Sequence, residues 1–179
     1  MRRGLIVFGI LIIWMTIQLR YNEAVIFKLT NAVCKTHNRS WVSINKCRLR
    51  AIARNKAAFY FNASFLQPTK NIFLEAQILK RASGFKPWLY KFSLDCCRFL
   101  KKSYNPVAII MYNLYSGFSN LNHTCPYEGD QIIDGFYPRY ELLHGLPLPT
   151  GDYLLEMTWL FYNKPQFLRN VYFQFTEDL

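Results

Sequence analysis

The clearest pattern along this chain is an alternation of apolar and polar positions with a period of two residues. Residues 56–66 read KAAFYFNASFL, where apolar or small side chains recur at every second position from Phe59 to Phe65. This period turns one set of side chains toward an interior and the other toward water, as in a half-buried β-strand. Including this segment, the inward positions are Phe59, Phe61, Ala63 and Phe65; Ile72, Leu74, Ala76 and Ile78; Trp88, Tyr90, Phe92 and Leu94; Tyr153, Leu155, Met157, Trp159 and Phe161; and Val171, Phe173 and Phe175.

These segments predict an all-β fold. They are rich in aromatic residues and separated by Gly, Pro and Asn, which favours a two-sheet β-sandwich over alternating strands and helices. One segment has a helical period instead: Asn105 and Pro106 form a helix start, and apolar residues then recur at helical spacing as far as Leu114. We therefore expect one short helix near 105–117, lying across the sandwich and ending near Gly117.

The N-terminus resembles an export signal. The basic head Met1–Arg3 precedes the apolar run GLIVFGILIIWMTIQL, which is shorter than the ~20 residues that a membrane span needs. We expect an N-terminal signal helix within a signal peptide at residues 1–22, followed by a single secreted, extracellular domain at residues 23–179. Because no clean cleavage pattern of small residues follows the run, an uncleaved signal anchor is the alternative.

Composition supports a large apolar interior. Hydrophobic residues make up 51% of the chain and aromatic residues 17%, whereas charged residues reach only 18%, which excludes a disordered protein. The net charge of +11 comes from Lys and Arg side chains scattered between Lys28 and Arg169. The densest basic stretch, residues 46–50, alternates with apolar residues as the outer face of a strand would, so no nucleic-acid partner is expected.

The chain contains no recognisable catalytic motif. A nucleophile elbow, a zinc-protease motif and a glycine-rich phosphate loop are all missing. His123 is interpreted as a hydrogen-bonding loop residue, because His37 and His144 have no ligand spacing to it. Glu128 and Asp130 are interpreted as solvated residues of a turn that contains glycine. We expect a protein that is not an enzyme and has no cofactor and no metal.

Three asparagines fit the acceptor pattern for N-linked glycans. Asn38, Asn62 and Asn122 are each followed by Ser or Thr at the second position, without an intervening proline. All three fall on expected loops or outward strand faces. An exported chain is therefore predicted to be a glycoprotein.

Five cysteines matter because an exported chain folds where disulfides persist. Cys34 and Cys47 lie on neighbouring expected strands, and a hairpin between them can bring their α-carbons within bonding range. The second bridge joins Cys125 to either Cys96 or Cys97. One thiol is left over, either as a buried small hydrophobic side chain or as the site of an intermolecular bridge.

Six blocks of the sequence occur in a specific order: TNAVC at 30–34, CRL at 47–49 leading to Arg54, GFKPWLY at 84–90, DCCRFL at 95–100, SNLNHTCPY at 119–127 and LPLPTGDY at 146–153. Together they resemble a large insect family whose members are mostly known only as a domain of unknown function. That family includes the fly chemosensory CheB-type proteins and is similar to the ML (MD-2-related lipid-recognition) superfamily. The resemblance covers essentially the whole chain after residue 22.

The resemblance implies an immunoglobulin-like, ML-like β-sandwich, secretion and a hydrophobic ligand held between the sheets. It also implies which cysteine pairs with Cys125. The family pattern reads Asp, any residue, Cys, a basic residue and Phe, which places the family cysteine at Cys97 and makes Cys96 a departure from it.

Two function hypotheses follow. The first is a secreted, non-enzymatic binding protein for a lipid or other hydrophobic small molecule, such as a pheromone-like ligand in a chemosensory role. The second is a secreted or signal-anchored subunit that assembles with a membrane receptor or channel and has a packed, ligand-free core. Interior volume separates them. The expected ligand-binding residues are Phe59, Phe61, Phe65, Trp88, Tyr90, Phe92, Trp159, Phe161, Phe173 and Phe175.

Overall fold

The structure is a computed structural model that describes residues 26–138 and 148–176. The predicted signal segment, residues 1–22, lies outside the described residues. The described elements are, in chain order, β1 (Ile26–Thr36), β2 (Val42–Ala53), β3 (Lys56–Thr69), β4 (Ile72–Ala82), β5 (Gly84–Asp95), α2 (Cys96–Lys101), α3 (Pro106–Tyr115), the 3-10 turn η1 (Ser116–Phe118), β6 (Tyr127–Phe136), β7 (Gly151–Phe161) and β8 (Lys164–Thr176).

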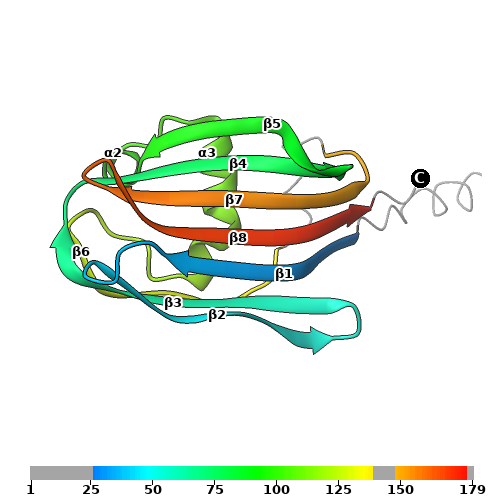
Figure 1. Ribbon diagram of the computed structural model, residues 1–179, viewed down its shortest axis with the longest axis horizontal. Helices are drawn as coiled ribbons and strands as arrows, with labels where there is room; N and C mark the ends of the chain where they lie inside the picture. Colours follow the sequence, from blue (N-terminus) through cyan, green and yellow to red (C-terminus); the bar gives the residue numbers. More distant parts are fainter. Residues whose placement is uncertain (1–25, 139–147, 177–179) are drawn as a thin grey trace, which may run out of the picture.

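The strands form two antiparallel sheets, which confirms the predicted all-β, two-sheet fold (Figure 1). The larger sheet has the order β1-β8-β7-β4-β5 and the smaller one the order β2-β3-β6. The sheets approach each other where β1 lies against β2 and β3. Strands β5 and β6 are edge strands, and the chain between them holds α2, α3 and η1.

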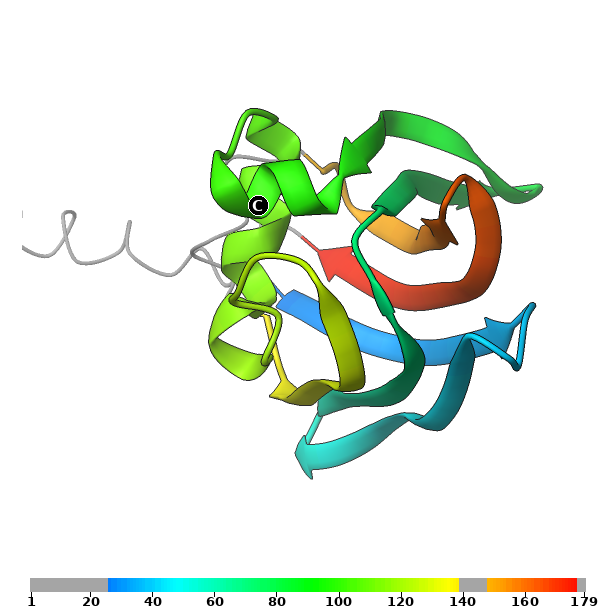
Figure 2. The ribbon, with the colours of Figure 1, turned by 90° about the vertical axis from the view of Figure 1, so that its left-hand side faces the viewer.

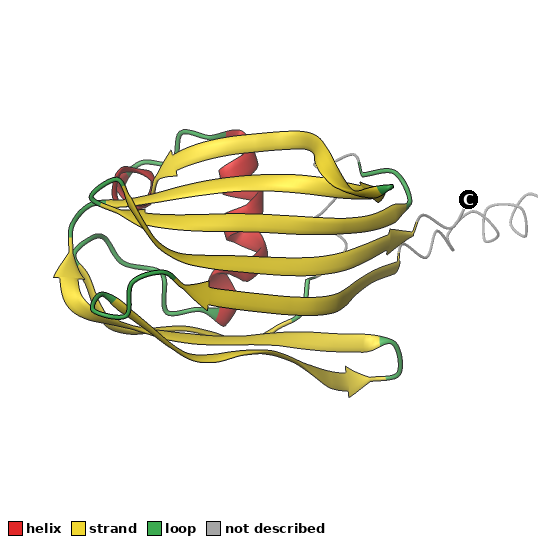
Figure 3. Ribbon diagram, in the orientation of Figure 1, coloured by secondary structure: helices red, strands yellow, loops and turns green. Residues whose placement is uncertain are grey.

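Helix α3 runs across the strands on one face of the larger sheet (Figure 3). Seen from the end of the strands, it stands at the side of the molecule between β5 and the smaller sheet (Figure 2). Its neighbours are consistent with this placement, because α3 contacts β5 and the η1 turn that follows it contacts β6. The helix thus closes the space between the two sheets on the side away from β1 and β2.

Alternation of side chains explains the core. The inward positions predicted for β3, β4 and β8 are buried, and those of β7 are buried apart from the half-buried Leu155. Aromatic rings pack across the two sheets: Phe65 meets Phe161 edge to face, with ring centroids 4.9 Å apart, and Phe61 stacks on Phe167 at 6.1 Å. Such offset and edge-on contacts add to the stabilisation from buried area.

Helix α3 begins and ends close to the predicted residues. The Asn105 side chain caps it by accepting a hydrogen bond from the Ala108 backbone N–H at 3.1 Å, and Pro106 occupies the first turn. The sequence did not predict α2, which starts where Asp95 accepts a hydrogen bond from the Arg98 backbone N–H at 2.9 Å. The chain therefore has a second short helix besides the one that was expected.

The predicted inward face of β5 is wrong for Trp88, whereas Tyr90 is half-buried and packs against the core. Residues 88–90 bulge out of the ladder, because Gln77 pairs with Lys91 and Leu79 already pairs with Pro87. Tyr90 has a φ of 66°, which breaks the two-residue alternation at that point. Trp88 is consequently 37% exposed, and the Lys80 ammonium lies 5.1 Å from its ring centroid.

Strand β6 replaces the predicted turn around Glu128 and Asp130. Both residues lie on the strand, and Asp130 pairs with Ser64 of β3. The Asp130 carboxylate accepts a hydrogen bond from the Ser64 hydroxyl on the exposed face of the smaller sheet. Gly129 has a φ of 70° and marks a local irregularity within β6. In the sequence, a glycine at such a position looks like part of a turn.

Both predicted disulfides are present, Cys34–Cys47 and Cys97–Cys125, and Cys96 is free and buried. The hairpin expected for Cys34 and Cys47 is absent, because β1 pairs with β8 and β2 pairs with β3. That bridge joins the two sheets instead, with α-carbons 6.1 Å apart. The second bridge ties the start of α2 to the residues before β6, so each side of the sandwich carries one covalent link.

Candidate functional site

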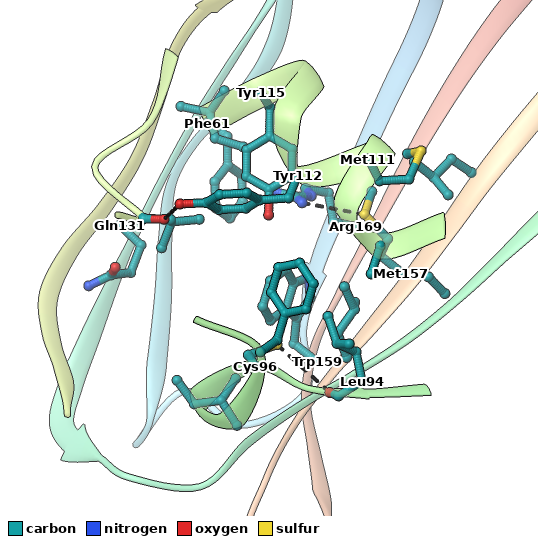
Figure 4. Close-up of a pocket in the computed structure, with 18 of the residues that line it drawn as sticks. Phe61, Leu94, Cys96, Met111, Tyr112, Tyr115, Gln131, Met157, Trp159 and Arg169 are labelled. Carbon is teal, nitrogen blue, oxygen red and sulfur yellow. Dashed lines mark hydrogen bonds between the residues drawn. The ribbon is translucent and has the colours of Figure 1, made fainter. Parts of the chain in front are cut away.

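A cavity of about 130 Å³ lies in the interior between the two sheets and α3. Its walls come from β3, β4, β5 and α2, from α3 and β6, and from β7 and β8 (Figure 4). From α3, the side chains of Ala108, Met111 and Tyr115 close one wall. The lining is almost entirely apolar, which suits a hydrophobic occupant.

Half of the predicted ligand-binding residues line the cavity. Those that line it are Phe59, Phe61, Phe65, Phe92 and Trp159. Phe161, Phe173 and Phe175 are buried but lie in the packed core away from the cavity, where Phe173 stacks on Phe27 and Tyr153. Trp88 and Tyr90 lie on the bulge of β5 and do not reach it.

A charged residue that the sequence did not single out also lines the cavity. Arg169 of β8 is 4% exposed, and its guanidinium lies 5.1 Å from the Phe61 ring centroid and 5.5 Å from that of Trp159. Its Nη2 donates a hydrogen bond to the Met157 sulfur at 3.3 Å, and its Nε has no hydrogen-bond partner. Figure 4 shows this side chain beside Met157 and close to α3.

No counter-ion accompanies this charge in the described part of the chain. The only ion pair there joins Arg81 to Asp152 on the surface, at 3.6 Å. Burial lowers the pKa of Arg169 to about 10, and the nearby Tyr115 opposes that shift. Because this pKa is still well above 7, the guanidinium is charged at neutral pH.

Two further polar atoms of the cavity wall lack partners. Gln131 of β6 is 3% exposed, and its Nε2 donates to the backbone oxygens of Glu128 and Gly129, at 3.2 Å each. Its Oε1 is left without a hydrogen bond, and so is Nε1 of Trp159. Buried polar groups are normally paired, so three unpaired atoms on residues that line one cavity, two from the larger sheet and one from the smaller, distinguish this cavity from ordinary core.

The sequence carried a signal for these residues. The alternation that turns Val171, Phe173 and Phe175 inward also turns Arg169 inward, two positions earlier. Likewise, Gln131 lies two positions before the buried Ile133, so the alternation along β6 also turns Gln131 inward. Inward polar residues in otherwise apolar faces were therefore visible as exceptions to the pattern, although their meeting in one cavity was not.

Burial keeps three further groups at the cavity, Cys96, Tyr115 and Tyr127, in their neutral forms. Burial raises the pKa of the Cys96 thiol to about 12, and the neighbouring Asp95 adds to the shift. Burial likewise raises the pKa of Tyr127 to about 12 and that of Tyr115 beyond its usual range. None of these groups is activated as a nucleophile or a base at neutral pH.

His123 is held in a loop, as predicted. Its Nδ1 lies 2.8 Å from the Thr124 backbone oxygen, and its ring stacks on Tyr127 with centroids 4.1 Å apart. Among residues 26–138 and 148–176, no group of three or more His, Cys, Asp or Glu side chains is arranged to hold a metal ion. Within the same ranges, no helix is both long and apolar enough to cross a membrane.

The three predicted glycan acceptors differ in their surroundings. Asn122 is exposed, and Asn38 and Asn62 are half-buried. The Asn38 Oδ1 accepts hydrogen bonds from the Ser40 backbone N–H and hydroxyl, at 3.1 and 2.7 Å. The Asn62 Oδ1 accepts one from Asn45 at 3.2 Å on the outer face of β3.

Fold and cavity together define an all-β, two-sheet protein with an apolar cavity between its sheets and two disulfides. Residues 74–155 match a family model described as "Protein of unknown function (DUF1091)". The match runs from β4 into β7 and includes both helices, so it confirms the resemblance to an uncharacterised domain family over that range. No match was found among curated proteins.

Proposed function

We propose that this chain is a secreted, non-enzymatic binding protein that holds a small hydrophobic molecule in the cavity between its two sheets. The observation that carries the proposal is the cavity of about 130 Å³ with its apolar lining. An engineered apolar cavity of about 150 Å³ in another protein stays dry and binds benzene, so a void of this size is large enough for a ligand. A fully packed core would leave no such space.

Burial of the ligand supplies the affinity. At about 25 cal/mol per Å², enclosing roughly 200 Å² of apolar ligand surface contributes about 5 kcal/mol before ordering costs. Ligands of one ring or a short acyl chain match the cavity as it stands. A longer chain needs more room than this, which an outward shift of α3 would provide, because that helix lies between the edge strands and outside both sheets.

Secretion and a chemosensory role belong to the proposal. Two disulfides are consistent with folding in an oxidising compartment. The resemblance to the CheB-type and ML-like proteins is what suggests a pheromone-like or lipid ligand and an ML-like, immunoglobulin-related topology. The alternative, an interaction subunit of a receptor or channel, predicts an interior that takes up no ligand.

Uptake of a fluorescent fatty-acid probe tests the proposal, together with mass spectrometry of lipids extracted from the secreted protein. The cavity-filling variant Ala108→Leu adds bulk to the wall formed by α3 and is expected to reduce probe uptake at least about 10-fold, since occupied space cannot bind. Asn113→Leu places the same side chain on the exposed side of that helix and serves as the control. A wild-type protein that takes up no probe and carries no lipid favours the interaction subunit.

A further inference from the structure

We propose that the ligand is an amphiphile with a single carboxylate, which pairs with Arg169 inside the cavity while the apolar tail lies against the aromatic walls. This inference rests on the proposed function, because it names the chemical class of molecule that the cavity would hold. It starts from Arg169, the one charged side chain that lines the cavity among residues 26–138 and 148–176.

An unpaired charge in such a place is costly. Taking a guanidinium out of water is unfavourable unless a counter-ion and hydrogen bonds replace its hydration. Arg169 is 4% exposed, and in the described part of the chain no carboxylate lies within ion-pair distance of it. The described part of the protein therefore supplies no counter-ion for Arg169, and an anionic ligand would supply one.

The contacts that Arg169 does make leave donors free. The Met157 sulfur is a weak acceptor, and the ring faces of Phe61 and Trp159 attract the charge without occupying its N–H groups. The Nε atom is buried and has no hydrogen-bond partner. The planar fork of a guanidinium matches the two oxygens of a carboxylate, which can accept parallel hydrogen bonds from it.

Charge balance favours one negative charge rather than two. A single carboxylate neutralises the single guanidinium, whereas a phosphate monoester would leave excess negative charge in an apolar cavity. The other unpaired atoms agree: Nε1 of Trp159 is a second free donor, and Oε1 of Gln131 is an acceptor that would repel a second anionic group.

The test compares three eight-carbon probes by titration calorimetry with the purified full chain at neutral pH: octanoic acid, 1-octanol and octylamine. Their tails are matched, so differences in affinity report the head group. Octanoate is expected to bind about 10-fold or more tightly than octanol, as a charge-assisted hydrogen bond provides, and octylamine is expected to bind worst.

Variants test whether Arg169 causes the expected preference for octanoate over octanol. Arg169→Met keeps the length of the side chain but removes the charge, and it is expected to bind octanoate and octanol equally. Arg169→Lys keeps the charge and is expected to retain a smaller preference for the acid. Arg48→Met removes the same charge from an exposed position on β2 and is expected to leave the preference intact.

The outcomes separate the inference from the proposed function. Equal binding of acid and alcohol by the wild type overturns the inference and leaves the hydrophobic binding protein standing. A preference for acid that survives Arg169→Met also overturns it, because another group must then hold the anion. Failure of all three probes to bind counts against the proposed function itself. The wild-type comparison remains decisive even if Arg169→Met does not fold.

Discussion

At the scale of single residues, the unusual feature is the charged guanidinium of Arg169, which is buried among apolar side chains. Arg169 lies on β8, next to the edge strand of the larger sheet, where Met157 and Cys34 are its cross-strand partners. Nearly every other inward position of that sheet is apolar. A residue that costs stability in the empty protein is better explained by what it binds than by what it packs against.

The variant Arg169→Met is therefore expected to stabilise the ligand-free protein. Replacing a buried ion pair with apolar side chains of similar volume gains up to about 1–4 kcal/mol in other proteins, and removing a buried charge that has no counter-ion should gain a comparable amount. Urea unfolding of delipidated protein measures this change, and Arg48→Met, exposed on β2, should change stability little. A loss of stability in Arg169→Met would show that the ring contacts of the guanidinium hold the core together.

Cys96 is expected to be chemically inert in the folded protein. Burial is the main reason that the pKa of its thiol rises to about 12, so almost no thiolate is present at pH 8. Iodoacetamide should label Cys96 slowly in native protein and quickly in urea. Rapid native labelling, or a Cys96-linked dimer, would instead support the intermolecular bridge.

The same pKa sets a pH dependence for stability. Because the folded protein holds the Cys96 proton more tightly than the unfolded chain does, this group costs no stability below pH 9. Its contribution falls as pH rises from about 9 toward 12, where only the unfolded chain ionises. Unfolding free energies of wild type and Cys96→Ala should therefore converge or cross as pH rises above 9, with the wild type losing more.

At the scale of elements, α3 lies outside the sheets and forms a wall of the cavity, so its stability should affect ligand release. Asn105→Ala removes its cap and should cost about 1 kcal/mol of stability, while also speeding ligand release. Stability is read by urea unfolding and release by stopped-flow displacement of a bound probe. Asn113→Ala lies on the exposed side of the helix and should change neither quantity much.

Loss of either disulfide should lower stability, but only loss of the Cys97–Cys125 bridge should also speed ligand release. In the chain-entropy model, closing loops with sequence separations of 13 and 28 residues contributes about 3 and about 3.6 kcal/mol. Losing either bridge thus destabilises the fold to a similar extent. Only the pair Cys97→Ser and Cys125→Ser frees the segment that contains α3, so it alone should raise the rate of probe release. Equal acceleration by Cys34→Ser with Cys47→Ser would contradict this division.

At the scale of the whole molecule, the exported state is the main untested prediction. If the chain enters the secretory pathway, an N-glycosidase should increase its electrophoretic mobility. Asn122 is the most exposed acceptor, so Asn122→Gln should remove one glycan. Protein from a secretory host that shows no mobility change would count against export.

Local pattern by itself determined the all-β class, the inward faces of most strands and the start of α3. A two-residue period depends only on the geometry of an extended chain, and a capping Asn before Pro acts within one helical turn. The prediction failed at Trp88 because residues 88–90 bulge out of the pairing between β4 and β5, which interrupts the alternation there. It also missed the pairing of β6 with β3, since Gly129 within a strand reads locally as a turn.

Only the tertiary structure decided which inward residues would face a void. Phe61 and Phe173 follow the same alternation, yet Phe61 lines the cavity and Phe173 stacks between neighbouring rings. The distance between the sheets and the position of α3 make that difference, and both depend on contacts between residues far apart in the chain. For the same reason Arg169 and Gln131, 38 positions apart by their numbers, become neighbours of one cavity only in the folded protein, where nonlocal packing fixes what shares a space.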